Sequence, residues 1–146
     1  MSDDTPDIVI VDRPIDPGLL RKLVERHFED MVKFVVDVER GVAAVGGELH
    51  ADEEALLLDN GSRQEHLWGA NYYPGRGEAD CVEYTSLINI RPAHGNRSMV
   101  IGDPVVYQPI HPKPPNQLFR KSSINPPGRF VRYRLRARAL LASGTG

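Results

Sequence analysis

Acidic and imidazole side chains that could bind a metal ion or move a proton are concentrated in one short segment. Residues 46–62, GGELHADEEALLLDNGS, place Glu48, His50 and Asp52 two positions apart. In an extended backbone such side chains point the same way, so the three would share one face. A carboxylate–imidazole–carboxylate set can hold a divalent cation such as Mg²⁺, Mn²⁺ or Zn²⁺. If the protein is an enzyme, hydrolysis with His50 or Glu48 as general base is the simplest chemistry for this set.

The same segment is also typical of the beginning of a helix. Asp52 could cap the helix, with Glu53 and Glu54 at its positive end, where each would stabilise it by about 0.3–1 kcal/mol. His50 would then donate a hydrogen bond to a backbone carbonyl. This interpretation accounts for the three acidic residues but not for Glu48 or His50, which precede the helix, so both interpretations stay open.

A second group of polar residues could bind an anion. Arg91 and Arg97 could form a fork for a phosphate or carboxylate group, and Gly95 allows a left-handed backbone that turns N–H groups towards an anion. A structural role is the alternative, in which Arg91 pairs with Glu48 or Glu83 and ties the predicted sheet to its loop. The candidate ligand-binding residues are Asn71, Asn89, Arg91, Asn96 and Arg97.

Other common catalytic signatures do not occur in the sequence. It contains no Gly-x-Ser-x-Gly, no glycine-rich phosphate loop and no Cys-x-x-Cys, so acyl transfer by a serine nucleophile has no support. The single cysteine, Cys81, cannot form an intramolecular disulfide, which fits a reducing compartment. Whether the protein is an enzyme stays open.

The elements that must position these residues can be predicted from spacing. Asp16 precedes Pro17, as an N-cap precedes proline at the first helical position, and apolar residues recur at helical spacing up to about Asp30. Phe34, Val36 and Val38 alternate with Lys33, Val35, Asp37 and Glu39, and after a turn residues 42–45 are apolar. This pattern predicts a helix followed by a strand hairpin.

Further along the chain the sequence predicts one more helix and two more strands. The helix runs from about residue 52 to 59 and ends at Asn60–Gly61, a pair suited to a left-handed C-cap. Residues 66–73 and 81–92 have the composition and alternation of strands. We therefore expect an α+β fold with a mainly antiparallel sheet of about four or five strands and two helices on one face.

The character of the sequence changes after Gly102. Residues 1–103 hold 20 acidic and 10 basic residues, whereas residues 104–146 hold eight basic and no acidic residues, and seven of the twelve prolines lie between Pro104 and Pro127. We expect a single domain over residues 8–103 and an irregular basic extension over 104–146. Alternate arginines in the extension could bind nucleic acid, but we favour an irregular tail, either without fixed structure or docked on the acidic domain.

Composition restricts the class of protein. Hydrophobic residues make up 40% and charged residues 26%, which is ordinary for a soluble domain with one core. The acidic first residues do not resemble a signal peptide, and no apolar stretch approaches the length of a membrane span. We expect a cytoplasmic protein that does not enter a membrane.

Four short motifs together resemble a family of short prokaryotic proteins known only as a domain of unknown function. They are GGELHAD (46–52), LWGAN (67–71), NIRP (89–92) and GNRS (95–98). The resemblance covers roughly residues 8–103 and implies one intact domain without supplying a mechanism. From about Met99 the sequence departs from that family, and a replaced, fused or misread C-terminus is our hypothesis for the departure.

Three functions are compatible with the sequence. The first is binding of an anionic, phosphate-bearing ligand, with or without a divalent metal, in a pocket shared by the acidic segment and the arginine–asparagine loop. The second is a non-catalytic protein that binds a partner or forms a homodimer through a strand edge. The third is association with nucleic acid through the basic extension.

Overall fold

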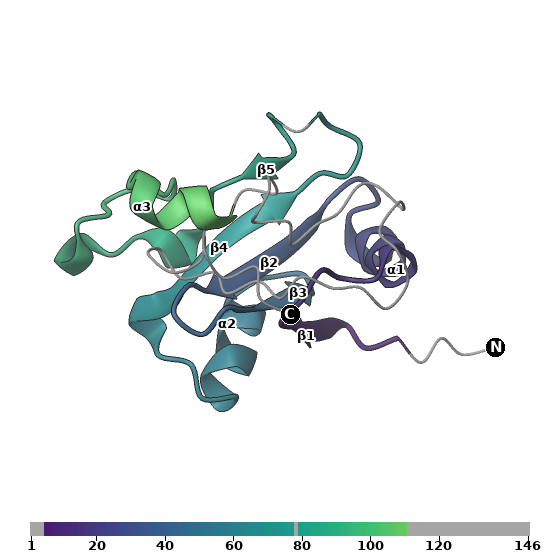
Figure 1. The fold of residues 1–146 in the computed structure, drawn as a ribbon, viewed down its shortest axis with the longest axis horizontal. Helices are drawn as coiled ribbons and strands as arrows, with labels where there is room; N and C mark the ends of the chain where they lie inside the picture. The colour runs from purple at the N-terminus through teal and green to yellow at the C-terminus, as the bar shows by residue number, and fades with distance from the viewer. Residues whose placement is uncertain (1–4, 78, 111–146) are drawn as a thin grey trace.

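Five antiparallel strands form the sheet of the protein. The computed structural model describes residues 5–77 and 79–110 (Figure 1). The strands are arranged in the order β1-β3-β2-β4-β5, which Figure 1 shows from bottom to top. Their bounds are β1 (Ile8–Val11), β2 (Val32–Asp37), β3 (Val42–Gly46), β4 (Leu67–Tyr72) and β5 (Val82–Glu83). The α+β class is therefore confirmed.

Helix α1 (Pro17–His27) begins where the sequence predicts it. The side chain of Asp16 accepts a hydrogen bond from the backbone N–H of Leu19 at 3.0 Å, and proline occupies the first turn. Its buried side chains, Leu20, Leu23 and Val24, follow helical spacing and pack on the sheet.

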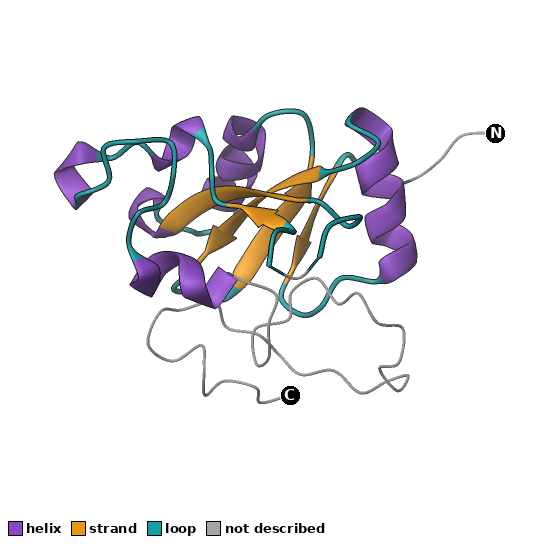
Figure 2. Ribbon diagram, turned by 90° about the horizontal axis from the view of Figure 1, so that it is seen from above, coloured by secondary structure: helices purple, strands orange, loops and turns teal. Residues whose placement is uncertain are grey.

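The two longer helices lie on opposite faces of the sheet, and the prediction of two helices on one face is wrong. Phe34 of β2 packs in the same core cluster as the buried residues of α1. The next residue, Val35, points to the other face and packs with Leu57 of helix α2 (His50–Asp59). Successive strand residues point to opposite faces, so a strand with consecutive buried apolar residues is covered on both sides. Figure 2 shows helices on both sides of the strands.

The predicted strand over residues 81–92 is correct only at its beginning. Strand β5 spans two residues. Ser86 then accepts a hydrogen bond from the N–H of Ile88 at 3.2 Å and begins the short 3-10 helix Leu87–Asn89. A second 3-10 helix, Pro92–His94, follows directly. The hydrogen bond to the Ser86 side chain favours this local helix over continued strand pairing, although the sequence alternates as a strand would.

The packed part of the chain continues past the boundary expected at residue 103. Helix α3 (Pro104–Tyr107) and the 3-10 helix Gln108–Ile110 follow, and Ile101 and Ile110 are both buried in the core. The alternate arginines, Arg132 to Arg138, lie outside the described residues. In the described ranges no helix has both the length and the apolar character needed to cross a membrane.

Candidate functional site

Glu48, His50 and Asp52 do not share one extended face, which corrects the geometry expected for a metal or catalytic triad. Helix α2 begins at His50, and its N-cap, Leu49, makes no side-chain capping bond. Glu48 and Asp52 are exposed, whereas His50 is 7% exposed. Across residues 5–77 and 79–110, no three His, Cys, Asp or Glu side chains are grouped so that they could hold a metal ion.

The glycine pair before α2 explains why the extended segment stops there. Gly46 and Gly47 have φ angles of 111° and 86°, a backbone region that L side chains rarely adopt. A Cβ atom on Gly46 would collide with the carbonyl oxygen of Asp7, and one on Gly47 would lie 2.9 Å from Ile8. The pair therefore turns the chain out of β3 while letting β1 pack closely against it.

His50 is held inside the protein in its neutral form. Its Nε2 lies 2.8 Å from the carbonyl oxygen of Ala70, and since a carbonyl only accepts, Nε2 must carry the hydrogen. Burial lowers the pKa of His50 to about 4, although the bond to Ala70 opposes the change. A general base near neutral pH needs a higher pKa and access to substrate, so the geometry does not suit His50 for that role.

His50 meets the arginine–asparagine loop above one glycine of β4. A Cβ atom on Gly69 would lie 2.7 Å from Cβ of Ser86 and 3.2 Å from Cδ2 of His50. Only glycine lets both side chains approach the strand so closely. His50 of α2 and Ser86 of the segment after β5 therefore approach the same strand residue.

Asn89 is used to complete the sheet. Its Oδ1 accepts a hydrogen bond from the N–H of Gly69 at 2.8 Å, and its Nδ2 donates to the carbonyls of Gly69 and Met99, both at 3.0 Å. The side-chain amide thus replaces the neighbouring strand that β4 lacks at this point. Asn89 is 0% exposed, so its amide is not free to bind a ligand.

Asn96 has a similar structural role in the loop. Its Nδ2 shares its hydrogens among the carbonyls of Asn89, Ser98 and Val100 at 2.8–3.0 Å, and its Oδ1 accepts from Gly102. Both amide hydrogens are used within the chain, and the amide oxygen accepts one bond there. The structure therefore contradicts the prediction that Asn89 and Asn96 offer their amides to a ligand.

Asn71 and Arg97 are the other two candidate ligand-binding residues. Asn71 donates to Oε1 of Glu83 at 2.9 Å across the β4–β5 pair, and it lies close enough to His50 to raise the pKa of the imidazole. Arg97 is exposed on its loop. Neither side chain lines the cavity beside Arg91 described below.

Glu53 is a buried ionisable residue that the sequence did not single out. It is 0% exposed, and neither carboxylate oxygen has a hydrogen-bond partner of good geometry in the described part of the chain, although the backbone N–H of Gly46 is near enough to lower its pKa slightly. Burial raises the pKa of Glu53 well above its usual value, while the charge of Lys33 opposes the rise. Helical spacing was the available signal, because Glu53 lies between His50 and Leu57 on the inner face of α2.

Arg91 is the candidate residue whose binding capacity is not used. Its side chain is 9% exposed, and its guanidinium lies 4.8 Å from the ring centre of Trp68. Glu54 is 3.7 Å away, near enough for an ion pair but too far for a hydrogen bond. Neither terminal nitrogen of Arg91 has a hydrogen-bond partner among the described residues. Arg91 thus pairs with a carboxylate, but with Glu54 and not with Glu48 or Glu83.

A cavity of about 510 Å³ lies beside Arg91. One part of its lining is polar and comes from α2, from residues 63–65 and from the loop after β5. The other part is apolar. The polar lining residues are Glu54, Arg63, Gln64, Glu65, Arg91 and His94, and the apolar ones are Leu87, Ile88, Ile90, Pro92 and Ala93.

The comparison with protein families agrees with the resemblance drawn from the four motifs. The model of the family described as a protein of unknown function, DUF5674, matches residues 9–112. The chain belongs to this family. The DUF5674 match runs beyond residue 103, consistent with the burial of Ile110. No curated protein and no solved structure matches the chain.

Proposed function

We propose that the protein binds a small organic anion that carries a phosphate group, in the cavity beside Arg91. The observation that supports this proposal is a buried guanidinium with two terminal nitrogens that donate no hydrogen bond to any described residue. Buried polar groups are nearly always hydrogen-bonded, and those left without a partner have a cost of about 1–3 kcal/mol each. A phosphate group matches the planar fork of arginine and would remove this cost.

Glu54 determines how an anion reaches Arg91. Because the guanidinium is nearly buried, a ligand must displace the carboxylate of Glu54, which lies 3.7 Å away without a hydrogen bond. This weak ion pair stabilises the buried charge of Arg91 when no ligand is bound. Arg63 and His94 at the lining add further donors for the same anion.

The apolar lining favours an organic anion over an inorganic one. Leu87 is 71% exposed and Ile90 is 42% exposed, although both are large apolar side chains at the cavity. Covering about 50 Å² of this surface would contribute roughly 1–1.5 kcal/mol, or about tenfold in affinity. We therefore expect an aromatic phosphate to bind more tightly than phosphate alone.

Calorimetric titration of the full-length protein tests the proposal. We expect phenyl phosphate to bind about tenfold more tightly than inorganic phosphate, and neutral benzyl alcohol to bind too weakly to measure. Arg91→Ala should weaken phenyl phosphate binding about 30-fold, equivalent to ~2 kcal/mol. Arg97→Ala, a matched loss of an exposed arginine from the same loop, should change affinity less than about twofold.

A second variant separates binding from folding. Glu54→Gln removes the competing carboxylate and keeps the shape, so we expect phenyl phosphate to bind several-fold more tightly. Equal weakening by Arg91→Ala and Arg97→Ala, or weaker binding by Glu54→Gln, would refute the proposed site. Melting temperatures of all variants establish that each one is folded.

The proposal concerns binding and includes no reaction. His50, the residue best suited to proton transfer by type, does not line this cavity and is 7% exposed. The single cysteine, Cys81, is buried, which is compatible with the cytoplasmic location that we infer from the sequence. Fractionation of the source cells would test that location.

A further inference from the structure

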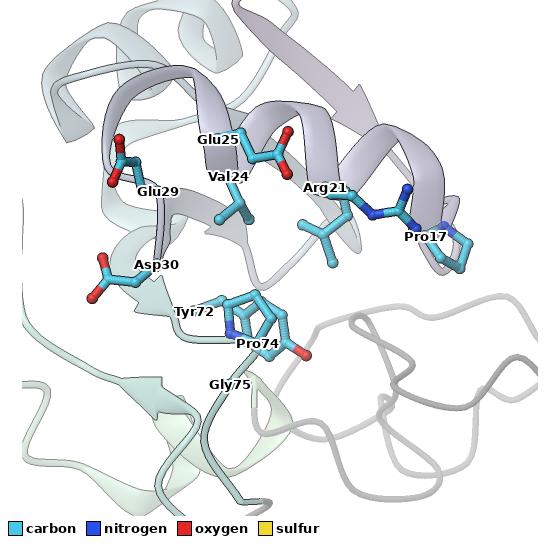
Figure 3. Close-up of a pocket in the computed structure, with 10 residues that line it drawn as sticks. Pro17, Arg21, Val24, Glu25, Glu29, Asp30, Tyr72, Pro74 and Gly75 are labelled. Atoms are coloured by element: carbon cyan, nitrogen blue, oxygen red, sulfur yellow. The ribbon is translucent and has the colours of Figure 1, made fainter.

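A second cavity, of about 630 Å³, lies between α1 and the end of β4. Figure 3 shows α1 on one side of it and Tyr72 and Pro74 on the other. Its floor is apolar, because Leu20, Val24 and Tyr72 are all buried there. This groove is lined by a different helix from the cavity beside Arg91, so it requires an explanation of its own.

The rim of this cavity is acidic. Glu25, Glu29 and Asp30 line it and are exposed, and Arg21 is the one basic side chain among the described lining residues. Figure 3 shows the carboxylates of Glu29 and Asp30 at the same end of the cavity. An apolar floor with a negative rim is complementary to a segment that has both apolar and positively charged side chains.

The sequence of this chain contains such a segment. Residues 111–146 hold eight Lys or Arg and no Asp or Glu, and residues 129–139 read RFVRYRLRARA. In extended form, that stretch has arginines on one face and apolar side chains such as Tyr133 and Leu135 on the other. The same chain therefore contains a segment whose charge is complementary to the acidic rim of the cavity.

The chain is also long enough to bring this segment to the cavity. The last described residue, Ile110, is buried in the same core cluster as Leu20, Val24 and Tyr72. The 19 residues from there to Arg129 can span up to roughly 60 Å when extended. Because the connection is covalent, binding within one molecule is favoured over binding between molecules.

We propose that residues 129–139 bind in the cavity of α1 and β4 of the same chain. Tyr133 and Leu135 cover the apolar floor, and the neighbouring arginines pair with Glu25, Glu29 and Asp30. Binding there withholds these arginines from polyanions, so the domain acts as a competitor for its own basic segment.

Photo-crosslinking in the full-length protein tests this contact. With p-benzoylphenylalanine in place of Tyr133, we expect crosslinks to residues 17–30 and 72–75 of the same molecule, mapped by peptide mass spectrometry. The combined variant Glu25→Gln, Glu29→Gln, Asp30→Asn should lower the crosslink yield at least fivefold, as should 1 M NaCl. The matched control, Glu48→Gln, Asp52→Asn, Asp59→Asn, removes three exposed carboxylates elsewhere and should leave the yield unchanged.

Three results would overturn the inference. Crosslinks that map mainly to other regions would place the segment elsewhere. An equal response to the rim variant and the control variant would show that the rim carboxylates do not bind it. Crosslinks mainly between isotopically light and heavy molecules would show that the segment binds a second copy and not its own chain.

Discussion

Two ionisable residues of α2, His50 and Glu53, are buried, and their burial changes the pH dependence of stability in opposite directions. Burial lowers the pKa of His50 to about 4, so folding is favoured fully only above the ordinary histidine value of 6.5, and stability is lost as pH falls from there to about 4. Burial raises the pKa of Glu53. Its protonated form favours folding at low pH, and that stability is lost as pH rises from about 4.5 through the raised pKa.

We expect Glu53→Met to stabilise the protein at pH 8 by about 1–3 kcal/mol, because methionine fills similar space without an unpaired carboxylate. The gain should be smaller at pH 5, where more of Glu53 is protonated in the folded protein. Urea denaturation at the two pH values measures both differences. Glu39→Gln, at an exposed turn residue outside α2, is the control and should change little at either pH. A gain equal at both values would mean that the carboxylate is not titrating in this range.

From a residue's type, the sequence predicts the kind of contact that the residue makes, but not which other residue it contacts. The sequence predicts that Asp16 caps α1, because this role follows from residue chemistry, and leaves open whether Arg91 binds an anion or pairs with a carboxylate. It could not show that the carboxylate is Glu54, since this depends on how α2 packs against the loop after β5. The sequence predicts Asn89 and Asn96 as ligand-binding residues, because an amide that replaces strand hydrogen bonds cannot be told in sequence from one in a binding site.

At the scale of elements, the edge of β4 explains the loop that follows β5. Strand β5 pairs with only two residues of β4, Asn71 and Tyr72. The backbone of Gly69 is then satisfied by the side chain of Asn89 and not by a strand. The sequence alternates through this region as a strand would, and for that reason the predicted strand was too long.

We expect Asn89→Ala to destabilise the protein by about 2–4 kcal/mol, because the N–H and carbonyl of Gly69 would lose their partners inside the protein. Urea denaturation provides the measurement. Asn60→Ala is the matched control, since Asn60 is exposed at the end of α2 and loses only an exposed hydrogen bond from Arg40, and it should cost less than about 1 kcal/mol. Similar losses for the two variants would contradict the proposed role of Asn89 at the sheet edge.

Elements with a local signal were predicted well. The hairpin of β2 and β3 and the C-terminal end of α2 at Asn60–Gly61 follow from alternation and from glycine, whose φ is 101° at Gly61. The relative position of the helices was predicted wrongly. Both faces of β2 are buried, and the consecutive apolar residues Phe34, Val35 and Val36 were the signal for this.

At the scale of the whole molecule, α2 and the loop after β5 meet over β4, and the cavity beside Arg91 lies where they meet. The sequence predicts a pocket shared by Glu48, His50, Asp52, Arg91 and Arg97, and of these residues only Arg91 lines this cavity. The contact runs through Gly69 and through the pair of Glu54 and Arg91, and not through a Glu48–His50–Asp52 face. Anion binding in this cavity requires that Arg91 has donors not used within the protein.

The most direct test is an NMR titration of the ¹⁵N-labelled full-length protein with phenyl phosphate. We expect saturable shifts in the backbone signals of Glu54, residues 63–65 and residues 87–94, and in the side-chain Nε–H of Arg91. Residues 17–30, which line the other cavity, should not shift. If these signals stay unchanged at saturating phosphate, or if the shifts fall mainly on α1, the proposed binding site is wrong.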